Sequence, residues 1–147
     1  NKMIYMAKLN TTYDSLREME KDKNRVYIPE SKKNPEVILD KKQGYFFLGG
    51  RSMPDNANDF YIPVFKEVDE YLKNPLDETK LVFKLDYLDS SSSQMVLALI
   101  YKFKTLFDKT KNLKVEWHYM EDDYDILETG ETYSELSGVD FEFISHI

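Results

Sequence analysis

The sequence predicts an α/β domain in which helices lie mainly on one face of a mixed sheet of five to six strands and leave much of the other face exposed. Segments with the two-residue alternation of strands take turns along the chain with segments that repeat apolar residues every three or four positions. Several predicted strands carry a polar face, whereas a sheet covered on both sides gives continuous apolar runs. Hydrophobic residues make up 41% of the 147 residues, which is enough for one packed core.

Residues 1–24 are predicted to form an N-terminal extension, and residues 25–147 a single domain. The extension is polar and weakly patterned. Ser15 and Glu18 have the spacing of a capping box, which predicts a short helix over residues 15–23. No repeat or linker interrupts the rest of the chain, so we expect one unit there.

The domain is expected to open with three strands. Residues 26–28 form a short apolar run that Pro29 stops. Residues 35–40 and 45–48 are two further runs of this kind, and the turn-forming stretch 41–44 between them predicts a β-hairpin.

Two later segments carry the apolar stripes of amphipathic helices. The first follows a polar loop at 51–58 and ends at Asn74 and Pro75, which stop a helix. Its stripe consists of Phe60, Val64, Val68 and Tyr71. The second helix begins at a run of serines, and its apolar face consists of Met95, Leu99, Phe103 and Leu106.

Strands are predicted on both sides of the second helix. In residues 79–88, one face carries Leu81, Phe83, Leu85 and Tyr87. Residues 113–119 alternate in the same way, with His118 on the polar side. An acidic helix at roughly 122–136, interrupted by Gly130, and a final strand at 139–143 complete the predicted order β-β-β-α-β-α-β-α-β.

The composition excludes several classes of function. The chain has no cysteine, so it forms no disulfide, thiolate metal site or cysteine nucleophile. A formal net charge of −7 with dispersed lysines disfavours nucleic acid, because its phosphates are bound by clustered Lys and Arg. No apolar run approaches the roughly 20 residues that span a bilayer. We therefore expect a cytoplasmic protein that binds no nucleic acid, no membrane and no cofactor.

The most informative segment is a run of four serines where a strand meets a helix, in YLDSSSSQ at 87–94. One serine suffices to cap a helix, so four exceed what a cap requires, and the functional interpretation of the run is a phosphoacceptor. A phosphate adds about −1.5 to −2 charges at neutral pH, and a helix N-terminus favours such a charge by roughly 0.3–1 kcal/mol. We expect phosphorylation to switch the binding of a partner rather than folding. The alternative is a solvated capping loop without regulation.

Four motifs resemble, in the same order, those of the SiaC family of regulatory phosphoproteins. They are NPEVILD at 34–40, GRSMPDNA at 50–57 with FY at 60–61, YLDSSSS at 87–93, and WHY at 117–119 followed by EDD at 121–123. The resemblance covers about residues 25–143. The strand–serine–helix unit is also similar to that of STAS domains, the anti-sigma-factor antagonists, which carry a phosphoserine at the same kind of junction. The resemblance therefore implies a STAS-like fold.

The resemblance also implies a non-catalytic bacterial partner-switching protein. Members of the family are phosphorylated by a protein kinase, reset by a metal-dependent protein phosphatase, and bind an effector protein when unmodified. For SiaC-like proteins this effector is a diguanylate cyclase, which links them to cyclic-di-GMP signalling and biofilm regulation.

The family's acceptor hydroxyl falls on Ser90. Asp89 stands where the family usually has Asn, and Gln94 where Lys is frequent, so the local field is more negative and Ser91 is the runner-up. The predicted partner-binding residues are Asp89, Ser91, Ser92, Ser93, Gln94 and Arg51. The guanidinium of Arg51 suits a phosphate or a partner's carboxylate, and a bond to the acidic loop that contains it is an equal alternative.

Two enzymatic alternatives stay open. A hydrolase would combine the serine run with His118 or His146, but the Gly-x-Ser-x-Gly turn typical of such enzymes is absent. A metal-dependent enzyme would use the acidic cluster at 121–125, whose charges are explained more simply by the start of a helix. Binding is favoured over both, so we expect no catalytic residue and no metal site. A structural domain without a switch is the third alternative.

Overall fold

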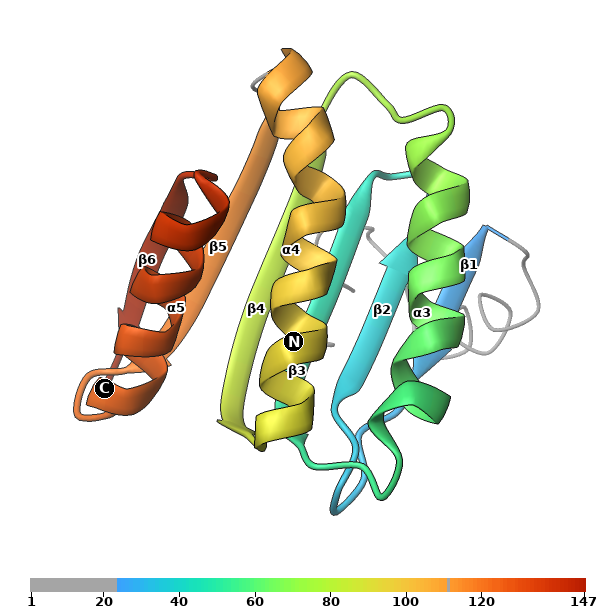
Figure 1. The fold of residues 1–147 in the computed structure, drawn as a ribbon. Helices are drawn as coiled ribbons and strands as arrows, with labels where there is room; N and C mark the ends of the chain where they lie inside the picture. Colours follow the sequence, from blue (N-terminus) through green and yellow to red (C-terminus); the bar gives the residue numbers. More distant parts are fainter. Residues whose placement is uncertain (1–23, 111) are drawn as a thin grey trace.

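The computed structural model of the protein describes residues 24–110 and 112–147, so the helix predicted at 15–23 lies outside the described residues. Strands and helices follow one another as predicted (Figure 1). The elements are β1 (Arg25–Ile28), β2 (Glu36–Asp40), β3 (Tyr45–Ser52), α3 (Ala57–Leu72), β4 (Thr79–Leu88), α4 (Ser90–Thr110), β5 (Leu113–Met120), α5 (Tyr124–Ser137) and β6 (Phe141–His146).

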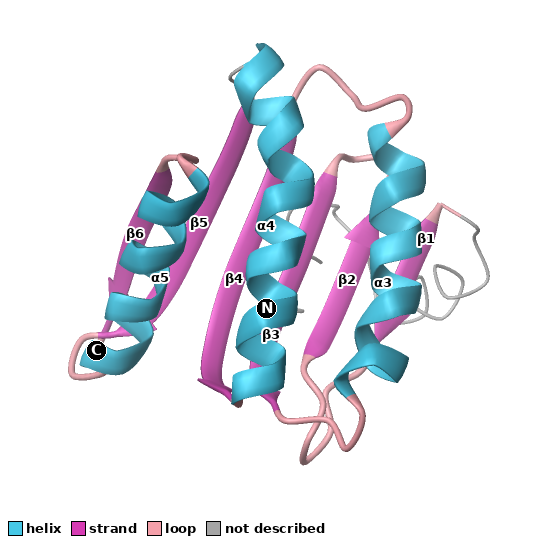
Figure 2. Cartoon of the chain, viewed as in Figure 1, coloured by secondary structure: helices cyan, strands magenta, loops and turns pink. Residues whose placement is uncertain are grey.

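The strands form one sheet in the order β1-β2-β3-β4-β5-β6. β1, β2 and β3 are antiparallel neighbours, whereas β3, β4, β5 and β6 run parallel. The helices α3, α4 and α5 connect the parallel strands and lie on the same face of the sheet (Figures 1 and 2). Each connection steps to the next strand in the same direction, and because such crossovers are right-handed, all three helices end on one side. The predicted mixed sheet with helices on one face is confirmed.

The main core lies between the sheet and the three helices. Trp117, Phe83 and Phe103 are fully buried there. Phe46 of β3 packs edge-on against Phe103 of α4 and Tyr71 of α3, with ring centroids 5.2 and 4.8 Å apart. These contacts hold α3 and α4 against β3, the strand that ends at Arg51 and Ser52.

The face opposite the helices, called the back face below, is less exposed than predicted. By strand alternation it carries a second apolar cluster, made of Ile38, Tyr45, Phe47 and Val82. Each of these side chains is at most 3% exposed. The expectation of an exposed face is therefore wrong for β2 and β3. Residues 45–48 are apolar at every position, which is the pattern of a strand covered on both sides.

The predicted alternation of β4 holds up to Leu85 and then changes. Two consecutive residues of β3 pair with Leu85 and Tyr87, so Asp86 is an extra residue in β4. A bulge of this kind turns the following side chains to the opposite face. Tyr87 is 43% exposed, and Leu88 packs against the main core in its place. The prediction that Tyr87 shares a face with Leu81, Phe83 and Leu85 is wrong.

Helix α5 begins two residues later than predicted and runs through Gly130 without a break. The predicted interruption is wrong. Glycine stands at position 130 because α5 lies close to β5 there, and a Cβ would lie 2.5 Å from the ring of Trp117.

In the part of the chain that the structure describes, no helix has both the length and the apolar character that a membrane span requires.

Candidate functional site

The serine run lies where β4 ends and α4 begins, and Asp89 caps the helix. The Asp89 side chain accepts a hydrogen bond from the backbone N–H of Ser92 (2.8 Å), and its carbonyl accepts from that of Ser93 (2.9 Å). The Asp89 N–H donates to the carbonyl of Ser52 at the end of β3 (3.0 Å). A carboxylate at this position satisfies donors that the first turn leaves unpaired and is stabilised by the helix dipole. The predicted helix start is confirmed, and the cap is Asp89 rather than a serine.

The four serines have different environments. Ser90 and Ser91 are exposed in the first turn of α4. Ser92 is fully buried. Ser93 is half-buried, and its carbonyl accepts a hydrogen bond from the Tyr133 hydroxyl of α5 (2.7 Å). Two hydroxyls of the run are thus open to another protein, and the side chain of Ser92 is not.

Ser92 belongs to a buried chain of hydroxyls that joins three elements. The Ser52 hydroxyl donates to that of Ser92 (2.8 Å) and lies 2.6 Å from the hydroxyl of Tyr61 in α3. Ser52 has one hydroxyl hydrogen and uses it in the hydrogen bond to Ser92. In the second hydrogen bond, Ser52 is therefore the acceptor and Tyr61 the donor. Burial raises the pKa of Tyr61 to about 12 against the opposing hydrogen bonds to Ser52 and Ser92, so this phenol keeps its proton. The start of α4 is thereby tied to β3 and α3.

Arg51 lies on the back face beyond the bulge of β4. Its guanidinium sits over the ring of Tyr87, 5.1 Å from the centroid, and its Nη2 approaches the Sδ of Met53 at 3.8 Å. The nearby loop carboxylate of Asp55 pairs with Lys33 instead, at 2.9 Å. The exposed Arg51 is therefore held by the ring of Tyr87 and by the sulfur of Met53 in its own loop, rather than by the carboxylate of Asp55.

A shallow groove opens beside the loop at 53–56, which joins the end of β3 to α3. Because β2 runs antiparallel to β3, the loop before β2 lies at the same edge of the sheet as the ends of β3 and β4. The Met53 N–H donates to the carbonyl of Lys33 and joins the two loops (2.8 Å). The groove between them has a volume of about 610 Å³ and is lined by Asn34, Pro54 and Phe60, among others. This edge combines exposed hydroxyls, mixed charges and apolar side chains.

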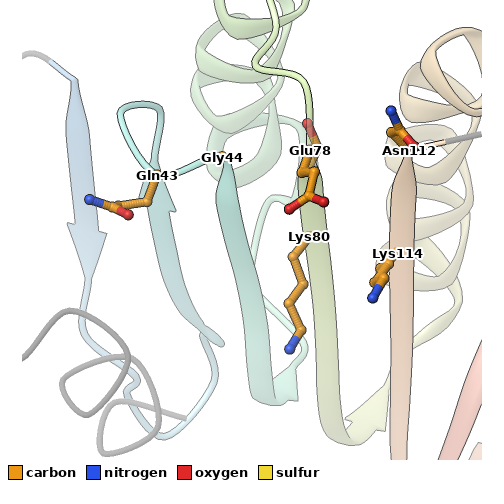
Figure 3. A pocket seen from close by; sticks show the side chains of 7 residues that line it. Gln43, Gly44, Glu78, Lys80, Asn112 and Lys114 are labelled. Atoms are coloured by element: carbon orange, nitrogen blue, oxygen red, sulfur yellow. The ribbon is translucent and has the colours of Figure 1, made fainter. Parts of the chain in front are cut away.

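A second pocket, of about 350 Å³, lies at the opposite edge of the sheet, where β4 and β5 begin (Figure 3). It is lined by Gln43, Gly44, Glu78, Thr79, Lys80, Asn112 and Lys114. No motif of the sequence points to this pocket. Lys80 is already paired with Glu116 at 2.7 Å, which reduces the positive charge offered to a ligand.

The two histidines contact each other rather than the serines. Nδ1 of His118 lies 2.8 Å from Nε2 of His146, and Nε2 of His118 lies 2.9 Å from a carboxylate oxygen of Glu116. His118 was predicted on the polar side of its strand, yet it is 6% exposed. Both its ring nitrogens are engaged on the back face, whereas the serines start a helix on the other face. The geometry gives no support to a serine–histidine hydrolase.

The acidic cluster at 121–125 begins α5. Asp123 is the N-cap, and its side chain accepts from the N–H of Ile126 at 3.1 Å. Across residues 24–110 and 112–147, no group of three or more His, Asp or Glu side chains is arranged to hold a metal ion. The cluster thus has the structural role that its position predicts.

Ser52, Tyr61 and Tyr133 are the residues of the site that the sequence did not reveal. Ser52 and Tyr133 bond the serine run from other elements, each 40 positions away along the chain, and Tyr61 bonds Ser52. A tyrosine within an apolar stripe gives no sign that its hydroxyl is used, and Ser52 was noted solely as part of a family motif.

Comparisons with known proteins agree with this arrangement. The model of the family described as SiaC family regulatory phosphoprotein matches residues 28–146. An uncharacterised protein of Pseudomonas aeruginosa (strain UCBPP-PA14) is 22% identical over 121 residues, which are 82% of this chain and 96% of the relative.

Similar solved structures come from the same species. A chain of the crystal structure of the diguanylate cyclase SiaD in complex with its activator SiaC superposes with a TM-score of 0.77 at 21% identity, covering 82% of this chain and 99% of that one. SiaC of Pseudomonas aeruginosa gives a TM-score of 0.73 at 22% identity, covering 83% and 98%. At this identity the structures establish the shared fold. Because the family model matches most of the sequence, the chain belongs to the SiaC family of regulatory phosphoproteins.

Proposed function

We propose that this protein is a non-catalytic partner-switching protein whose binding state is set by phosphorylation of Ser90. A protein kinase adds the phosphate, a protein phosphatase removes it, and the unmodified form binds an effector, a diguanylate cyclase, in the cytoplasm. The observation that carries the proposal is the exposed Ser90 hydroxyl at the first residue of a 21-residue helix anchored in the core.

The surroundings of the run support Ser90 as the acceptor and Ser91 as the runner-up. A kinase must reach the hydroxyl, and both of these serines are exposed. Ser92 is fully buried and takes part in the hydroxyl chain, so modifying it would require the start of α4 to come apart. Ser93 is half-buried under the contact with Tyr133.

A phosphate on Ser90 would act mainly on docking. The helix dipole favours the added charge by roughly 0.3–1 kcal/mol, while the carboxylates of Asp86 and Asp89 oppose it. The free protein keeps the phosphate in water at little cost. A partner seated on the start of α4 would have to desolvate a dianion, and each 1.4 kcal/mol lost lowers affinity about tenfold.

The proposed docking surface is the start of α4 with the neighbouring edge. It includes Asp89, Ser91, Ser93 and Gln94, with Arg51 on the adjoining strand end, and leaves out Ser92 because it is buried. The related SiaC is named as the activator of the diguanylate cyclase SiaD, which supports a cyclase as the effector here.

The test begins with the purified protein and candidate kinases encoded near its gene. Mass mapping is expected to find one phosphate, on Ser90, and none on the Ser90→Ala variant. Binding of the modified and unmodified forms to the cyclase is then measured by calorimetry. Phosphorylation and Ser90→Asp are each expected to weaken binding at least tenfold without changing the midpoint of thermal unfolding.

Thr105→Asp is the matched control, because it adds the same charge to an exposed position of α4 several turns away. It is expected to leave cyclase binding unchanged. Labelling at another residue would refute the assignment to Ser90. Equal affinities of the phosphorylated and unmodified forms would refute the switch itself.

A further inference from the structure

The contact between the two histidines leaves one ring nitrogen ready to bind an ion. Nδ1 of His118 lies 2.8 Å from Nε2 of His146, and the planes of the two rings differ by 19°. Nε2 of His118 lies 2.9 Å from a carboxylate oxygen of Glu116. A carboxylate accepts hydrogen bonds and donates none, so Nε2 of His118 carries the hydrogen and Nδ1 presents a lone pair toward His146. The hydrogen between the two rings therefore belongs to His146.

Met120 stands next to this pair on the same face of the sheet. It is the Cα partner of His146 in the pairing of β5 with β6, and it follows His118 by two positions in β5. Because side chains alternate along a strand, Met120 and His118 share the back face, whereas Tyr119 between them packs against the main core. Met120 is 42% exposed, and His146 is partly exposed. An ion can therefore reach the rings and the thioether from the solvent.

We propose that His118, His146 and Met120 bind one Cu(I) ion through Nδ1, Nε2 and Sδ. The thioether of methionine is a soft ligand that selects Cu(I), and imidazole also suits copper. The ion takes the place of the hydrogen between the rings. This hydrogen passes through solvent to Nδ1 of His146, so both imidazoles stay neutral and the site gains the charge of the ion alone. The proposal does not depend on Ser90 or on any partner protein.

The two rings need to move little to admit the ion. Metal–nitrogen bonds to histidine are about 2 Å long, so two ring nitrogens on a three-coordinate ion lie roughly 3.5 Å apart. Their present separation is 2.8 Å. Because β6 is the last strand in the order of the sheet, His146 can move outward by this small difference without displacing another strand.

His118 is held in the orientation that the site requires. Its ring N–H donates to Glu116, and that carboxylate lies 2.7 Å from Nζ of Lys80. Metal-binding histidines usually donate their other ring N–H to a carboxylate, which fixes the ring and makes the remaining nitrogen a better ligand. His118 is also 6% exposed, so its ring is confined by its neighbours. This ligand is thus oriented before an ion arrives.

The surroundings favour a soft monovalent ion over a divalent one. Lys84 of β4 interacts electrostatically with His146, and its repulsion of a bound cation grows with the charge of the ion. Within the described ranges 24–110 and 112–147, no three His, Asp or Glu side chains gather into a metal site, so the third ligand is the thioether. We therefore expect Cu(I) to bind more tightly than Zn²⁺.

Nuclear magnetic resonance of the full chain tests the proposal, because Cu(I) is diamagnetic. Under anaerobic conditions, one equivalent of Cu(I) is expected to shift the ring ¹⁵N resonances of Nδ1 of His118 and Nε2 of His146, together with the ε-methyl resonance of Met120. The ε-methyl resonances of Met53 and Met95 are expected to stay in place. Shifts of other methionines without shifts of the two ring nitrogens would overturn the site. An unchanged Met120 methyl resonance would overturn the assignment of the third ligand.

Competition with a chromophoric Cu(I) chelator then measures the affinity. Glu116→Gln keeps an acceptor for the His118 N–H but loses the charge, and is expected to weaken Cu(I) binding by about 10–100-fold. At saturation it should still show shifts of the same two ring nitrogens, because the ligands themselves remain. His146→Gln and Met120→Leu each remove a ligand and are expected to weaken binding at least as much.

Met53→Leu is the matched control, since it makes the same change as Met120→Leu at a methionine outside the proposed site. It is expected to keep the original affinity. Circular dichroism without copper checks that each variant is folded. Unchanged Cu(I) affinity in His146→Gln, or an affinity for Zn²⁺ equal to that for Cu(I), would overturn the proposal.

Discussion

Ser92 lies two positions after Ser90, and the two hydroxyls have opposite environments. Ser90 is exposed, whereas the hydroxyl of Ser92 accepts a hydrogen bond from that of Ser52, which in turn is bonded to Tyr61. The side chain of Ser92 points to the strands because α4 turns it inward, and Ser52 meets it from the end of β3. The proposed phosphoacceptor and the anchoring hydroxyl thus lie two positions apart in one run.

We predict that Ser92→Ala destabilises the fold although it removes a single oxygen. Without the Ser92 acceptor, one hydroxyl proton of the Ser52–Tyr61 pair stays buried and unbonded whichever way the pair is oriented. Leaving a buried donor unsatisfied costs about 1–3 kcal/mol. Urea denaturation should show a lower midpoint with an unchanged slope.

Ser91→Ala is the control for this change, since it is the same substitution at an exposed neighbour. Its free energy of unfolding should stay within about 0.5 kcal/mol of the original protein. If both variants lost the same stability, the buried hydroxyl chain would have no special role.

From the sequence, the site could be located at the serine run, but the buried serine could not be told apart from the exposed ones. A serine run before an apolar stripe predicts a helix start, and the start is observed at Ser90. Which serine is buried depends on Ser52, forty positions earlier. The histidine pair is similar, because His118 and His146 meet through the pairing of β5 and β6 across 28 positions.

Among the elements, α5 packs more closely on the sheet than its sequence suggests. Gly130 faces Trp117, whose indole N–H donates to the carbonyl of Ile126 at 2.9 Å. Trp117 also stacks on Phe141 and meets Tyr133 edge-on, with ring centroids 6.0 and 5.8 Å apart. The absence of a side chain at position 130 lets the helix backbone approach this ring.

We predict that Gly130→Ala destabilises the protein, against the intrinsic preference of helices. In an exposed helix interior the change would gain roughly 1 kcal/mol. Here the new Cβ would lie 2.5–2.6 Å from three ring atoms of Trp117, and overpacking of a core costs about 1–3 kcal/mol. The free energy of unfolding from denaturant titration should fall, and the tryptophan fluorescence of the folded state should change.

Glu131→Ala, at the next and exposed position of α5, controls for helix propensity. It should change stability by no more than about 0.5 kcal/mol. A Gly130→Ala variant as stable as the original would show that α5 can move away from β5 freely.

Element types could be predicted because periodicity is a local property, and the errors have tertiary causes. A glycine within a helix reads as a break unless its neighbour across the interface is known. The bulge at Asp86 similarly inverts the faces of the last residues of β4, so that Tyr87 leaves the core and meets Arg51. No alternation rule contains that extra residue.

For the whole molecule, the sequence predicted correctly on which side of the sheet the helices lie, but not how far the back face is buried. Consecutive strand–helix–strand units fix the handedness of the crossovers, and hence the common side of α3, α4 and α5. Polar positions of β4 and β5 suggested an exposed back face, yet Lys80, Glu116 and His118 satisfy one another there. Buried polar groups paired across strands look, in sequence, like positions open to solvent.

This polar network should make the stability of the whole domain depend on pH. Partial burial, together with the nearby charges of Lys84 and His118, lowers the pKa of His146 from its ordinary value of 6.5. Burial alone would raise the pKa of Glu116, but hydrogen bonds from Lys80 and His118 outweigh it and hold that pKa below its usual range. The 2.8 Å hydrogen bond between the two histidine rings needs one donor nitrogen and one acceptor nitrogen, so it is lost when both rings are protonated.

We predict that the free energy of unfolding falls as the pH drops below about 6.5. The unfolded chain then takes up a proton on His146 before the folded protein does, and proton uptake by the unfolded state favours unfolding. The loss continues until the pH passes the lowered pKa of the folded state; the contribution of Glu116 is lost separately, at more acidic pH. In His146→Gln, which keeps an amide able to bond His118, the slope of stability against pH between 6.5 and 5 should be smaller.

The control is Ser145→Ala, a change at the exposed neighbouring position, which carries no titratable group; it should keep the original slope. If His146→Gln also kept the original slope, the histidine pair would not link protonation to folding.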